Sequence, residues 1–523
     1  MDVEVVRQAF DPETRAAFER RVAEQAERVR EDLRAGRLDA ETFGVGLELE
    51  AYAVDGDGRL ATVPDDVFET ADCAKELGLH NVEVNTPATA FDAAGLASQA
   101  RELDERVGAV AAALAASDRG LALDAMWTIP PAEGSRAYLD AVRDVDGVTV
   151  AERMRSSPRY HALDNEVLRR AGGEIRLDLP GVDLTFDTIL VESLTTSIQP
   201  HVQMPRAADF PAYHDLAVRT MAPLLSLASN SPFLPADLYE GADPSVVDDT
   251  YHELRVPVFE GSINAGRPPG EGNVRVPADV DDVTEVPERV VADPTYGPVL
   301  SEAVEDEREA GDGAGDEGRD GAGDEDGDLY ADDIPEFDHK RGVHWRWVRG
   351  VVGGQPVGTT DGASVRLEYR PLPTQPTVRD NVSLAALTVG LLRGLVAADH
   401  PLRDLPWEDA HDAFYRVVRE GPDADLAWVA ADGERTAAAD AVYDDVFAHA
   451  RRGLREAGLD DAAVEEYLGP MERRRESGPP SAWKKARARE AIADGATVPE
   501  AVERAQRAYL ARAGPDGDPF ADW

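Results

Sequence analysis

Two glutamates in a short alternating segment are the first residues whose spacing suggests chemistry. In FGVGLELEAYAV, residues 43 to 54, apolar residues alternate with small or acidic ones, so Glu48 and Glu50 share one face of a predicted strand. NVEVN, residues 81 to 85, is a second short strand with Glu83 at its centre. Carboxylates one pleat apart lie about 7 Å apart, close enough to ligate one magnesium ion or two adjacent ions. Exposed acids are also ordinary in an acidic protein, so a solvated face remains an alternative.

A second candidate group lies late in the chain, in VRLEYRP, residues 365 to 371. The period of two places Arg366, Glu368 and Arg370 on one strand face. The carboxylate could hold a metal ion while the guanidinium groups bind a carboxylate or a phosphate bidentately. The same pattern also fits a structural ladder of salt bridges across strands.

A third group combines amides with a histidine in SIQPHVQMP, residues 197 to 205. Gln199, His201 and Gln203 share one face of this predicted strand. Neutral imidazole and amide groups suit a magnesium–nucleotide site, either as ligand or as donors to phosphate. A single histidine in a strand is more often structural, so this group needs support from the others.

Hydrophobic periodicity predicts the elements that must position these residues. Strands are predicted over residues 43–54, 81–85, 121–127, 363–371 and most of 185–204. Helices are predicted over residues 13–35, 93–117, 207–228, 381–398, 407–420, 436–457, 460–477, 481–493 and 498–513.

The longest apolar run, residues 382 to 398, is interrupted by Arg393 and is short for a membrane span. It predicts a buried helix. The N-terminal segment MDVEVVRQAFDPETR lacks the basic and apolar regions of a signal peptide. We therefore expect a cytoplasmic protein, in which the single cysteine, Cys73, is a small core residue.

The composition is strongly acidic. Asp and Glu number 102 against 54 Lys and Arg, for a formal net charge of −48, and the bases are almost all arginine. Such a charge repels nucleic acid and anionic membranes, so neither is expected as a partner. It suits a protein that stays soluble in concentrated salt, which predicts a halophilic source. An acidic mesophilic protein with an acidic insert is the alternative.

Residues 302 to 338 differ from the rest of the chain. Their centre, GDGAGDEGRDGAGDEDGD at 311 to 328, contains no apolar residue larger than alanine. Such a segment cannot bury enough apolar surface to fold alone, so we predict a disordered, solvated insert. A metal-collecting loop or a partner-binding segment would be the functional alternatives. No phosphate-binding GxxxxGK[ST] motif, GxSxG motif or zinc-like histidine spacing occurs elsewhere.

In this order, the segments resemble the glutamate–cysteine ligase family of carboxylate–amine ligases. The family opens with a G-x-E-x-E strand, here GLELE from Gly46 to Glu50, and continues with a short strand that carries a metal glutamate, here Glu83. A histidine-containing strand and a PLLLALSANSPF-like stretch follow in the family. SIQPHVQMP and PLLSLASNSPF match these two, with Gln199 and His201 at the family's histidine positions.

Two later motifs extend the resemblance. YHELRVPVFE supplies Arg255 before an aromatic–glutamate pair, and RLEYRPLPTQ supplies Glu368, Arg370 and Gln375 of the family's late signature. Outside the insert, the resemblance extends from about residue 43 to about residue 510.

The resemblance implies an α+β fold similar to glutamine synthetase. A curved, mainly antiparallel sheet would carry the site, with helices packed outside and a helical C-terminal region. The implied reaction uses ATP and Mg²⁺ to convert the γ-carboxylate of glutamate to an acyl phosphate and join it to the amine of cysteine. The residue roles that it implies are metal binding by Glu48, Glu50, Glu83 and Glu368, catalysis by Arg370 and Arg255, and substrate or nucleotide binding by Gln199, His201 and Arg366.

The same comparison divides the chain into an N-terminal helical segment (1–42), a catalytic core (43–400, including the insert) and a helical C-terminal region of the same domain (401–523). Some positions depart from the family pattern. Arg366 stands where threonine is usual and Pro373 where aspartate is usual. A related ligase with another amine acceptor, or a non-catalytic paralogue that kept the fold, therefore remains an alternative.

Overall fold

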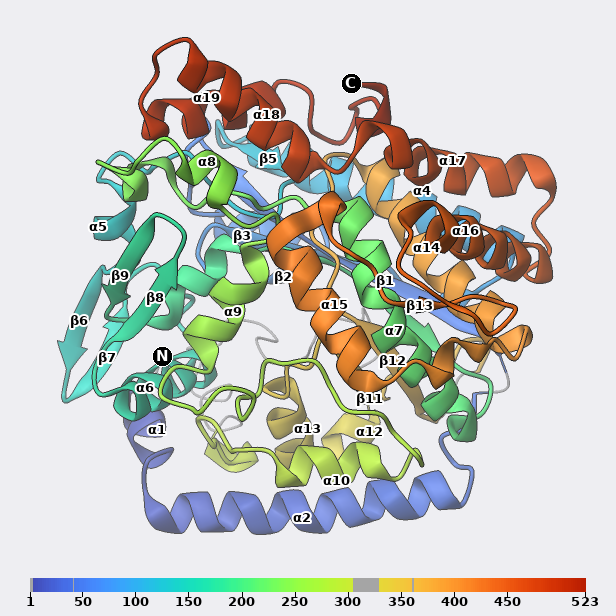
Figure 1. Cartoon of the computed structure of the whole chain (residues 1–523). Coiled ribbons are helices and arrows are strands. Elements are labelled where there is room, and N and C mark those ends of the chain that lie inside the picture. The colour runs from blue at the N-terminus through green and yellow to red at the C-terminus, as the bar shows by residue number, and fades with distance from the viewer. Residues whose placement is uncertain (1–2, 41, 304–328, 360–361) are drawn as a thin grey trace.

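One antiparallel sheet forms the centre of the protein. The computed structural model describes residues 3–40, 42–303, 329–359 and 362–523. The sheet has eight strands and the order β11-β12-β10-β1-β3-β2, with β4 and β5 also paired to β1. It curls into a half-barrel, as the family resemblance implies (Figure 1). Its strands are β1 (Gly44–Val54), β2 (Ala74–Lys75), β3 (Asn81–Asn85), β4 (Thr89–Ala90), β5 (Gly120–Ala122), β10 (Ile198–Gln203), β11 (Val348–Gly353) and β12 (Ser364–Tyr369).

The two faces of this sheet differ because polar and apolar residues alternate along its strands. In β1, Val45, Leu47 and Leu49 are buried in the hydrophobic core. Helices α4 (Ala93–Ala115), α7 (Phe210–Ala228) and α14 (Val378–Ala397) contact the sheet and contribute to the same core. The polar residues of the strands therefore gather on the opposite face.

Helix α14 is the apolar helix predicted from residues 381–398. Its length and apolar composition would suit a membrane span, but it is a core helix, buried mainly against α16 (Ala439–Glu456) and α17 (Asp461–Ser477). Its Arg393 reaches the carbonyl oxygen of Phe91 with NH1 at 2.9 Å. Arg393, the charged residue that interrupts the apolar run, is thus partly buried against the segment before α4.

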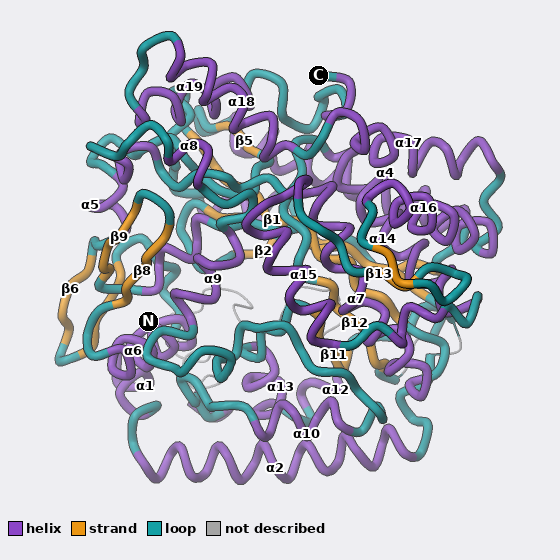
Figure 2. The backbone as a smooth tube through the Cα atoms, viewed as in Figure 1, coloured by secondary structure: helices purple, strands orange, loops and turns teal. Residues whose placement is uncertain are grey.

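The C-terminal region is helical, as predicted (Figure 2). A buried ion pair ties it to the core, since NH2 of Arg474 on α17 lies 2.9 Å from Oδ1 of Asp380 on α14. The remaining helices of this region are α15 (Trp407–Glu420), α18 (Pro480–Ala493) and α19 (Val498–Leu510), and the short strands β13 (Trp428–Val429) and β14 (Arg435–Thr436) lie between α15 and α16.

The long N-terminal helix α2 (Pro12–Arg34) begins at Asp11, whose side chain accepts a hydrogen bond from the N–H of Glu13. It packs along α10 (Glu285–Ala292) and α13 (Pro335–Gly342), and Figure 1 shows it running across one end of the molecule. Short helix α1 (Val3–Gln8) instead contacts α6 (Pro158–Ala171).

The prediction of a disordered insert over residues 302 to 338 is wrong at its C-terminal end, where the chain is helical. Residues Leu329–Asp332 form α12, and α13 follows at Pro335. Phe337 is fully buried, and Glu336 accepts hydrogen bonds from Arg21 of α2 at 2.8 Å and Gln25 of α2 at 2.6 Å. These contacts are distant in sequence, so the composition of the segment did not reveal them. The prediction for residues 304–328 falls outside the described residues.

Two predicted strands differ in extent. The segment 185–204 is interrupted by the 3-10 helix η1 (Ile189–Leu194), because the N–H of Ile189 donates to the buried Asp164 at 2.8 Å. The strand predicted over 121–127 ends at Ala122, because the Asp124 carboxylate lies buried against Lys484 of α18.

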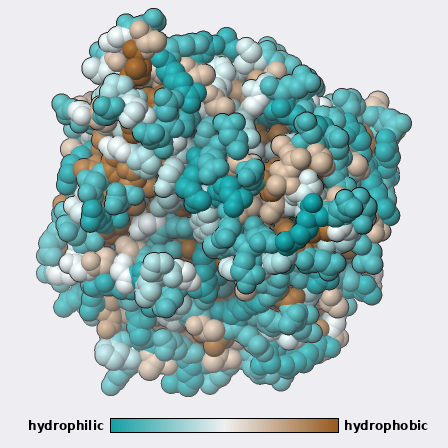
Figure 3. Space-filling model, in the orientation of Figure 1, coloured by the Kyte–Doolittle hydropathy of each residue, from teal (hydrophilic) through white to brown (hydrophobic). Residues whose placement is uncertain are grey.

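Smaller elements surround the sheet. The hairpins are β6 (Val142–Val145) with β7 (Val148–Ala151) and β8 (Ile175–Leu179) with β9 (Val182–Phe186). The short helices are α3 (Asp65–Thr70), α5 (Ser135–Leu139), α8 (Val246–Asp249) and α9 (Arg255–Ile263). The face drawn in Figure 3 is largely hydrophilic, as the acidic composition suggests.

Candidate active site

Strand register brings the predicted acidic residues together on the polar face of the sheet. Glu50 of β1 lies opposite Glu83 of β3, and Glu48 lies opposite Gln199 of β10. One strand farther along, His201 of β10 lies opposite Glu368 of β12. Residues directly opposite in an antiparallel pair point to the same face.

Three carboxylates form a tight group at one end of this face. Glu50, Glu76 and Glu83 each offer an oxygen atom, and these atoms lie within 4.8 Å of one another. Burial, together with repulsion from Glu76, raises the pKa of the Glu50 carboxyl to about 8, against the attraction of Arg370 and Arg255. Burial also raises the pKa of Glu83 well above its usual value, with Glu48 and Glu76 adding repulsion.

This group fits a divalent cation. Like-charged carboxylates that cannot ionise together without cost are stabilised by a cation between them. Oxygen ligands at this spacing are those that Mg²⁺ prefers. Asn85 supports the group, because its Nδ2 donates to Oε1 of Glu83 at 2.8 Å and orients that carboxylate.

Glu48 and His201 form a second pair next to the three carboxylates. Nε2 of His201 lies 2.8 Å from Oε1 of Glu48, and both side chains are buried. Within the described residues, neither of these two atoms nor Nδ1 of His201 makes a hydrogen bond. Buried polar atoms that lack a hydrogen bond are costly, so this pair also suits a ligand on the polar face.

Glu368 is held differently from the other predicted metal ligands. Its Oε2 accepts a hydrogen bond from Nε of Arg349 at 2.6 Å, and its Oε1 pairs with Arg370. Burial acts to raise the pKa of this carboxyl, but Arg349 and Arg370 outweigh it and hold the pKa well below its usual value. Glu368 therefore stays ionised and anchors two guanidinium groups on the polar face.

Arg370 is connected to the carboxylate group through Gln199. NH1 of Arg370 donates to Oε1 of Gln199 at 2.7 Å, and Nε2 of Gln199 donates to Oε1 of Glu50 at 2.9 Å. The backbone N–H of Ser197 donates to the other oxygen of Glu50 at 2.6 Å. These hydrogen bonds orient the guanidinium group of Arg370 and the carboxylate of Glu50 toward the same part of the polar face.

Arg255 lies at the end of the same face, at the first residue of α9. Its NH2 donates to the carbonyl oxygen of Pro371 at 2.5 Å, and its guanidinium lies 5.2 Å from the ring centroid of Trp347. Glu253 accepts a bond from its Nε at 3.2 Å. The charge of Arg255 partly opposes the rise in the pKa of Glu50, so Arg255 belongs to the same electrostatic environment.

Arg366 and Gln203 occupy the far end of the face. They are paired across β10 and β12, two residues from His201 and Glu368. The guanidinium of Arg366 packs against Gly354, where a side-chain Cβ would lie 2.6 Å from NH2 of Arg366. Gly354 has a φ of +67°, so both its conformation and its close approach favour glycine.

Sequence reasoning missed three residues of this face: Glu76, Asn85 and Arg349. Asn85 follows Glu83 at strand period and could have been included. Arg349 belongs to β11, a strand that was not predicted although Trp347 and Arg349 alternate with valine and glycine. Glu76 lies just beyond the two-residue strand β2, so no period marks it.

A histidine–aspartate group lies in the C-terminal region. Asp445 of α16 lies 3.1 Å from Nε2 of His400 and 3.4 Å from Nε2 of His449. Nδ1 of His400 accepts the N–H of Leu402 at 3.1 Å, so the ring proton is on Nε2 and points to Asp445. Trp428 also donates to Asp445, at 2.7 Å. This group is a hydrogen-bond network rather than a set of open metal ligands.

The solved structures that resemble the chain at low sequence identity include the following two. A glutamate–cysteine ligase from Francisella tularensis, in complex with AMP, is 13% identical with a TM-score of 0.47, over 91% of this chain and 89% of that chain. A bifunctional glutathione synthetase from Pasteurella multocida is 15% identical with a TM-score of 0.47, over 93% of this chain and 54% of that chain.

Sequence comparison identifies the family. No curated protein is a significant match. The model of glutamate–cysteine ligase family 2 matches residues 44–505, from the start of β1 to within α19. Because this match spans most of the sequence, the chain belongs to the glutamate–cysteine ligase family.

Proposed function

We propose that the protein is an ATP-dependent ligase that joins the γ-carboxylate of glutamate to the amine of cysteine through an acyl phosphate. Membership of the ligase family supports the reaction class. The observation that carries the proposal is the group of Glu50, Glu76 and Glu83 beside Arg370 and Arg255 on one sheet face. Such a face combines ligands for cations with guanidinium groups that bind anions.

In the first step, an oxygen of the glutamate γ-carboxylate attacks the γ-phosphorus of ATP and ADP leaves. Both reactants are anionic, so positive charge is needed where they meet. Arg370 and Arg255 would supply it and would orient the carboxylate or the transferring phosphoryl group. Gln199 would hold Arg370 in position through its hydrogen bond of 2.7 Å.

Mg²⁺ would be held by the oxygen atoms of Glu50, Glu76 and Glu83, with Glu48, His201 and Glu368 beside them. When bound, Mg²⁺ neutralises the charge of the phosphates and of the transition state. Glu368 would act both toward the metal site and as the partner of Arg349 and Arg370, which combines the two alternatives that the sequence pattern left open.

In the second step, the amine nitrogen attacks the acyl carbon and phosphate leaves. Water would compete with the amine, so the acyl phosphate must be shielded. The buried setting of Glu48, Glu83 and His201 supports such shielding. Another amine in place of cysteine is the second candidate, because Arg366 and Pro373 depart from the family pattern.

The test is ADP release by the full chain with ATP, Mg²⁺, glutamate and a panel of amines that includes cysteine. We expect ADP release that requires glutamate and rises with cysteine, together with γ-glutamylcysteine detected by mass spectrometry. If another amine gives the ligated product and cysteine does not, the acceptor is reassigned and the reaction class stands.

The control is a matched pair of variants. Glu50→Gln removes a carboxylate from the proposed site, whereas Glu503→Gln changes an exposed carboxylate on α19 that pairs with Arg507. We expect loss of ADP release only in Glu50→Gln. Glutamate-independent ADP release, or full activity in Glu50→Gln, would contradict the proposal.

A further inference from the structure

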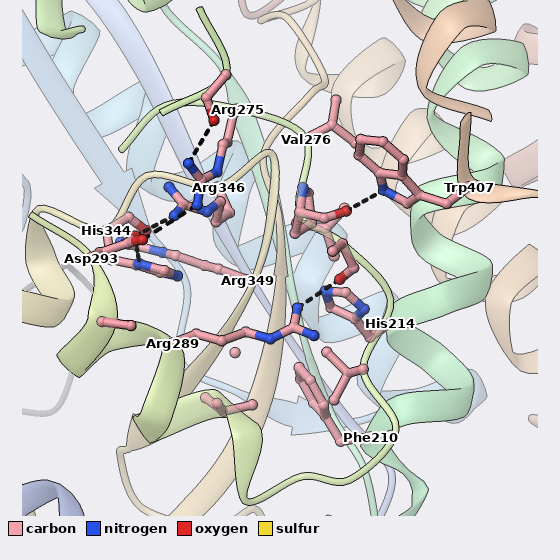
Figure 4. A pocket seen from close by; sticks show the side chains of 18 residues that line it. Phe210, His214, Arg275, Val276, Arg289, Asp293, His344, Arg346, Arg349 and Trp407 are labelled. Carbon is pink, nitrogen blue, oxygen red and sulfur yellow. Dashed lines mark hydrogen bonds and ion pairs between the residues drawn. The ribbon is translucent and has the colours of Figure 1, made fainter. Parts of the chain in front are cut away.

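A cavity of 490 Å³ lies at the edge of the sheet, beside β11 (Figure 4). Its walls come from β11, α7, α10, Trp407 of α15 and the segment 275–280. Val348 and Gly350 of β11 line it, and they lie on the helix-facing side of the strand, where a Cβ on Gly350 would meet Phe210 of α7 and Val286 of α10. The cavity is therefore separate from the polar face that carries the glutamates.

The charge of this cavity is opposite to that of the protein. Its lining contains Arg275, Arg289, Arg346 and Arg349 but a single carboxylate, Asp293. In the whole chain, acids outnumber bases by 102 to 54. Two further carboxylates pair with these arginines from outside the lining, Glu285 with Arg289 and Glu368 with Arg349. Four bases therefore face three acids, which still reverses the balance of the whole chain and leaves a positive potential in the cavity.

Neutral groups hold several of these arginines in place. NH1 of Arg275 donates to the carbonyl oxygen of Gly270 at 2.7 Å, and NH1 of Arg289 donates to that of Ala278 at 2.6 Å. Carbonyl oxygens orient a guanidinium group without neutralising its charge. Partial neutralisation comes from Asp293, which pairs with Arg346 and lies 3.4 Å from Arg275, and from Glu285, which lies 2.8 Å from Arg289.

The opposite wall is apolar and aromatic. Phe210, Val276, Val286 and Trp407 line it, and Figure 4 shows Trp407 and Phe210 on the side of the cavity away from Asp293. The indole of Trp407 is fixed by a hydrogen bond of 2.6 Å to the carbonyl oxygen of Pro277. A cationic wall that faces an apolar wall, in a volume of this size, is typical of a small-molecule site.

We propose that this cavity binds a small organic anion, with a phosphate or carboxylate group against the arginines and an apolar body against Trp407 and Phe210. Arg349 connects the cavity to the polar face, because its Nε donates to Oε2 of Glu368 at 2.6 Å. An anion that attracts Arg349 weakens its hold on Glu368, so binding in the cavity alters cation binding on the polar face, and the reverse.

The probe for this proposal is phenyl phosphate, titrated calorimetrically into the full chain at constant ionic strength and compared with inorganic phosphate and benzoate. We expect phenyl phosphate to bind about tenfold more tightly than inorganic phosphate, because only phenyl phosphate also contacts the apolar wall. Comparison with benzoate distinguishes a phosphate-preferring head-group site from a carboxylate-preferring one. Equal affinity for phenyl phosphate and inorganic phosphate would contradict the apolar half of the site.

Variants locate the binding. Arg289→Ala and Arg275→Ala should each weaken phenyl phosphate about tenfold. Arg176→Ala, which removes an exposed arginine on the β8–β9 hairpin, should not. Two cavity variants are used so that misfolding of one leaves the test intact. Unchanged affinity in the folded cavity variants, or loss only in Arg370→Lys, would place the anion on the polar face and overturn the proposal.

The connection through Arg349 is tested separately. Electron paramagnetic resonance is used to measure Mn²⁺ affinity with and without saturating phenyl phosphate. We expect the probe to shift Mn²⁺ affinity in the unaltered protein and to have no effect in Arg289→Ala. Identical Mn²⁺ affinity with and without the probe would show that the cavity and the polar face are independent.

Discussion

Glu50 and Glu368 lie on the same face of one sheet, yet the pKa values of their carboxyl groups shift in opposite directions. Both are affected by burial, which favours the neutral acid. For Glu50, a neighbouring acid, Glu76, adds to this effect and raises the pKa to about 8. For Glu368, Arg349 and Arg370 outweigh burial and lower the pKa. The face therefore has an end that attracts cations and an end where guanidinium groups already balance the charge.

The raised pKa of Glu50 predicts how pH acts on cation binding. A carboxyl group with a pKa of about 8 is largely protonated at neutral pH, and a cation must displace that proton. We expect Mg²⁺ affinity to increase between about pH 6 and about pH 9, with proton release on binding, measured by calorimetry in buffers of different ionisation enthalpy. In Glu50→Gln the increase should be smaller. Affinity that does not change with pH would contradict this assignment.

The same shift has a consequence for stability without metal. In the unfolded chain Glu50 returns to its ordinary pKa of 4.5. Between that pH and about pH 8, the native protein binds more protons than the unfolded chain, so the free energy of unfolding falls as pH rises. Urea unfolding across this range should show a smaller fall in Glu50→Gln than in the unaltered protein. An equal fall in both would mean that other groups dominate.

Glu368 and Arg370 test the chemistry of the polar face directly. Glu368→Gln keeps the shape of the side chain but removes its charge, and Arg370→Lys keeps the charge but removes the bidentate fork. We expect each to reduce ADP release per folded molecule by roughly tenfold to a hundredfold, because in the proposed reaction both orient groups at the reacting phosphate. Turnover and melting temperature are measured on both variants.

The matched controls are Glu503→Gln and Arg507→Lys, which alter an exposed ion pair on α19 and should leave both quantities nearly unchanged. A purely structural ladder at Glu368 and Arg370 predicts a different pattern, with a lower melting temperature and normal turnover in the folded fraction. That pattern would exclude Glu368 and Arg370 from the proposed catalytic groups.

At the scale of elements, helices α14 and α16 pack closely through glycines. A Cβ on Gly453 of α16 would lie 2.0 Å from the carbonyl oxygen of Gly390, and one on Gly394 of α14 would lie 1.9 Å from that of His449. Backbone atoms cannot yield as side chains do, so the crossing requires glycine. Because α14 also packs against β10, this crossing helps to position the strand that carries Gln199 and His201.

Replacement of Gly453 by alanine should therefore destabilise the protein by about 1–3 kcal/mol, the usual cost of overpacking, measured by urea unfolding. Gly108 provides the control, since it lies inside helix α4, where a Cβ would have no other atom within 4 Å outside the helix's own backbone. Gly108→Ala should stabilise the protein by up to about 1 kcal/mol through helix propensity. A Gly453→Ala variant as stable as the unaltered protein would contradict the close crossing.

At the scale of the whole molecule, the net charge of −48 predicts a dependence on salt. Screening weakens as ionic strength falls, with a Debye length of about 3 Å at 1 M and about 30 Å at 0.01 M. We expect the melting temperature to rise steadily with KCl over this range. Sucrose at matched osmolality controls for solute exclusion. A melting temperature independent of KCl would argue against a halophilic protein.

The sequence by itself determined most of the local structure of this protein. Alternation predicted β1, β3 and β12 and the shared faces of Glu48 with Glu50 and of Glu368 with Arg370, because strand period is a local property. Ordered motifs predicted the family for the same reason, since they record residue types and spacing. Helix periodicity predicted α4, α7, α14 and the C-terminal helices within a few residues.

Only the tertiary structure decided which of these residues meet. Glu76 lies beside Glu50 and Glu83 through two strand pairings. Arg349 contacts Glu368 from β11, a strand that the sequence analysis did not predict. The burial of residues 334–337 against α2 likewise depends on a contact across some 300 positions of sequence. Pairing partners, burial and the resulting pKa shifts depend on long-range packing, which a local pattern of residue types does not contain.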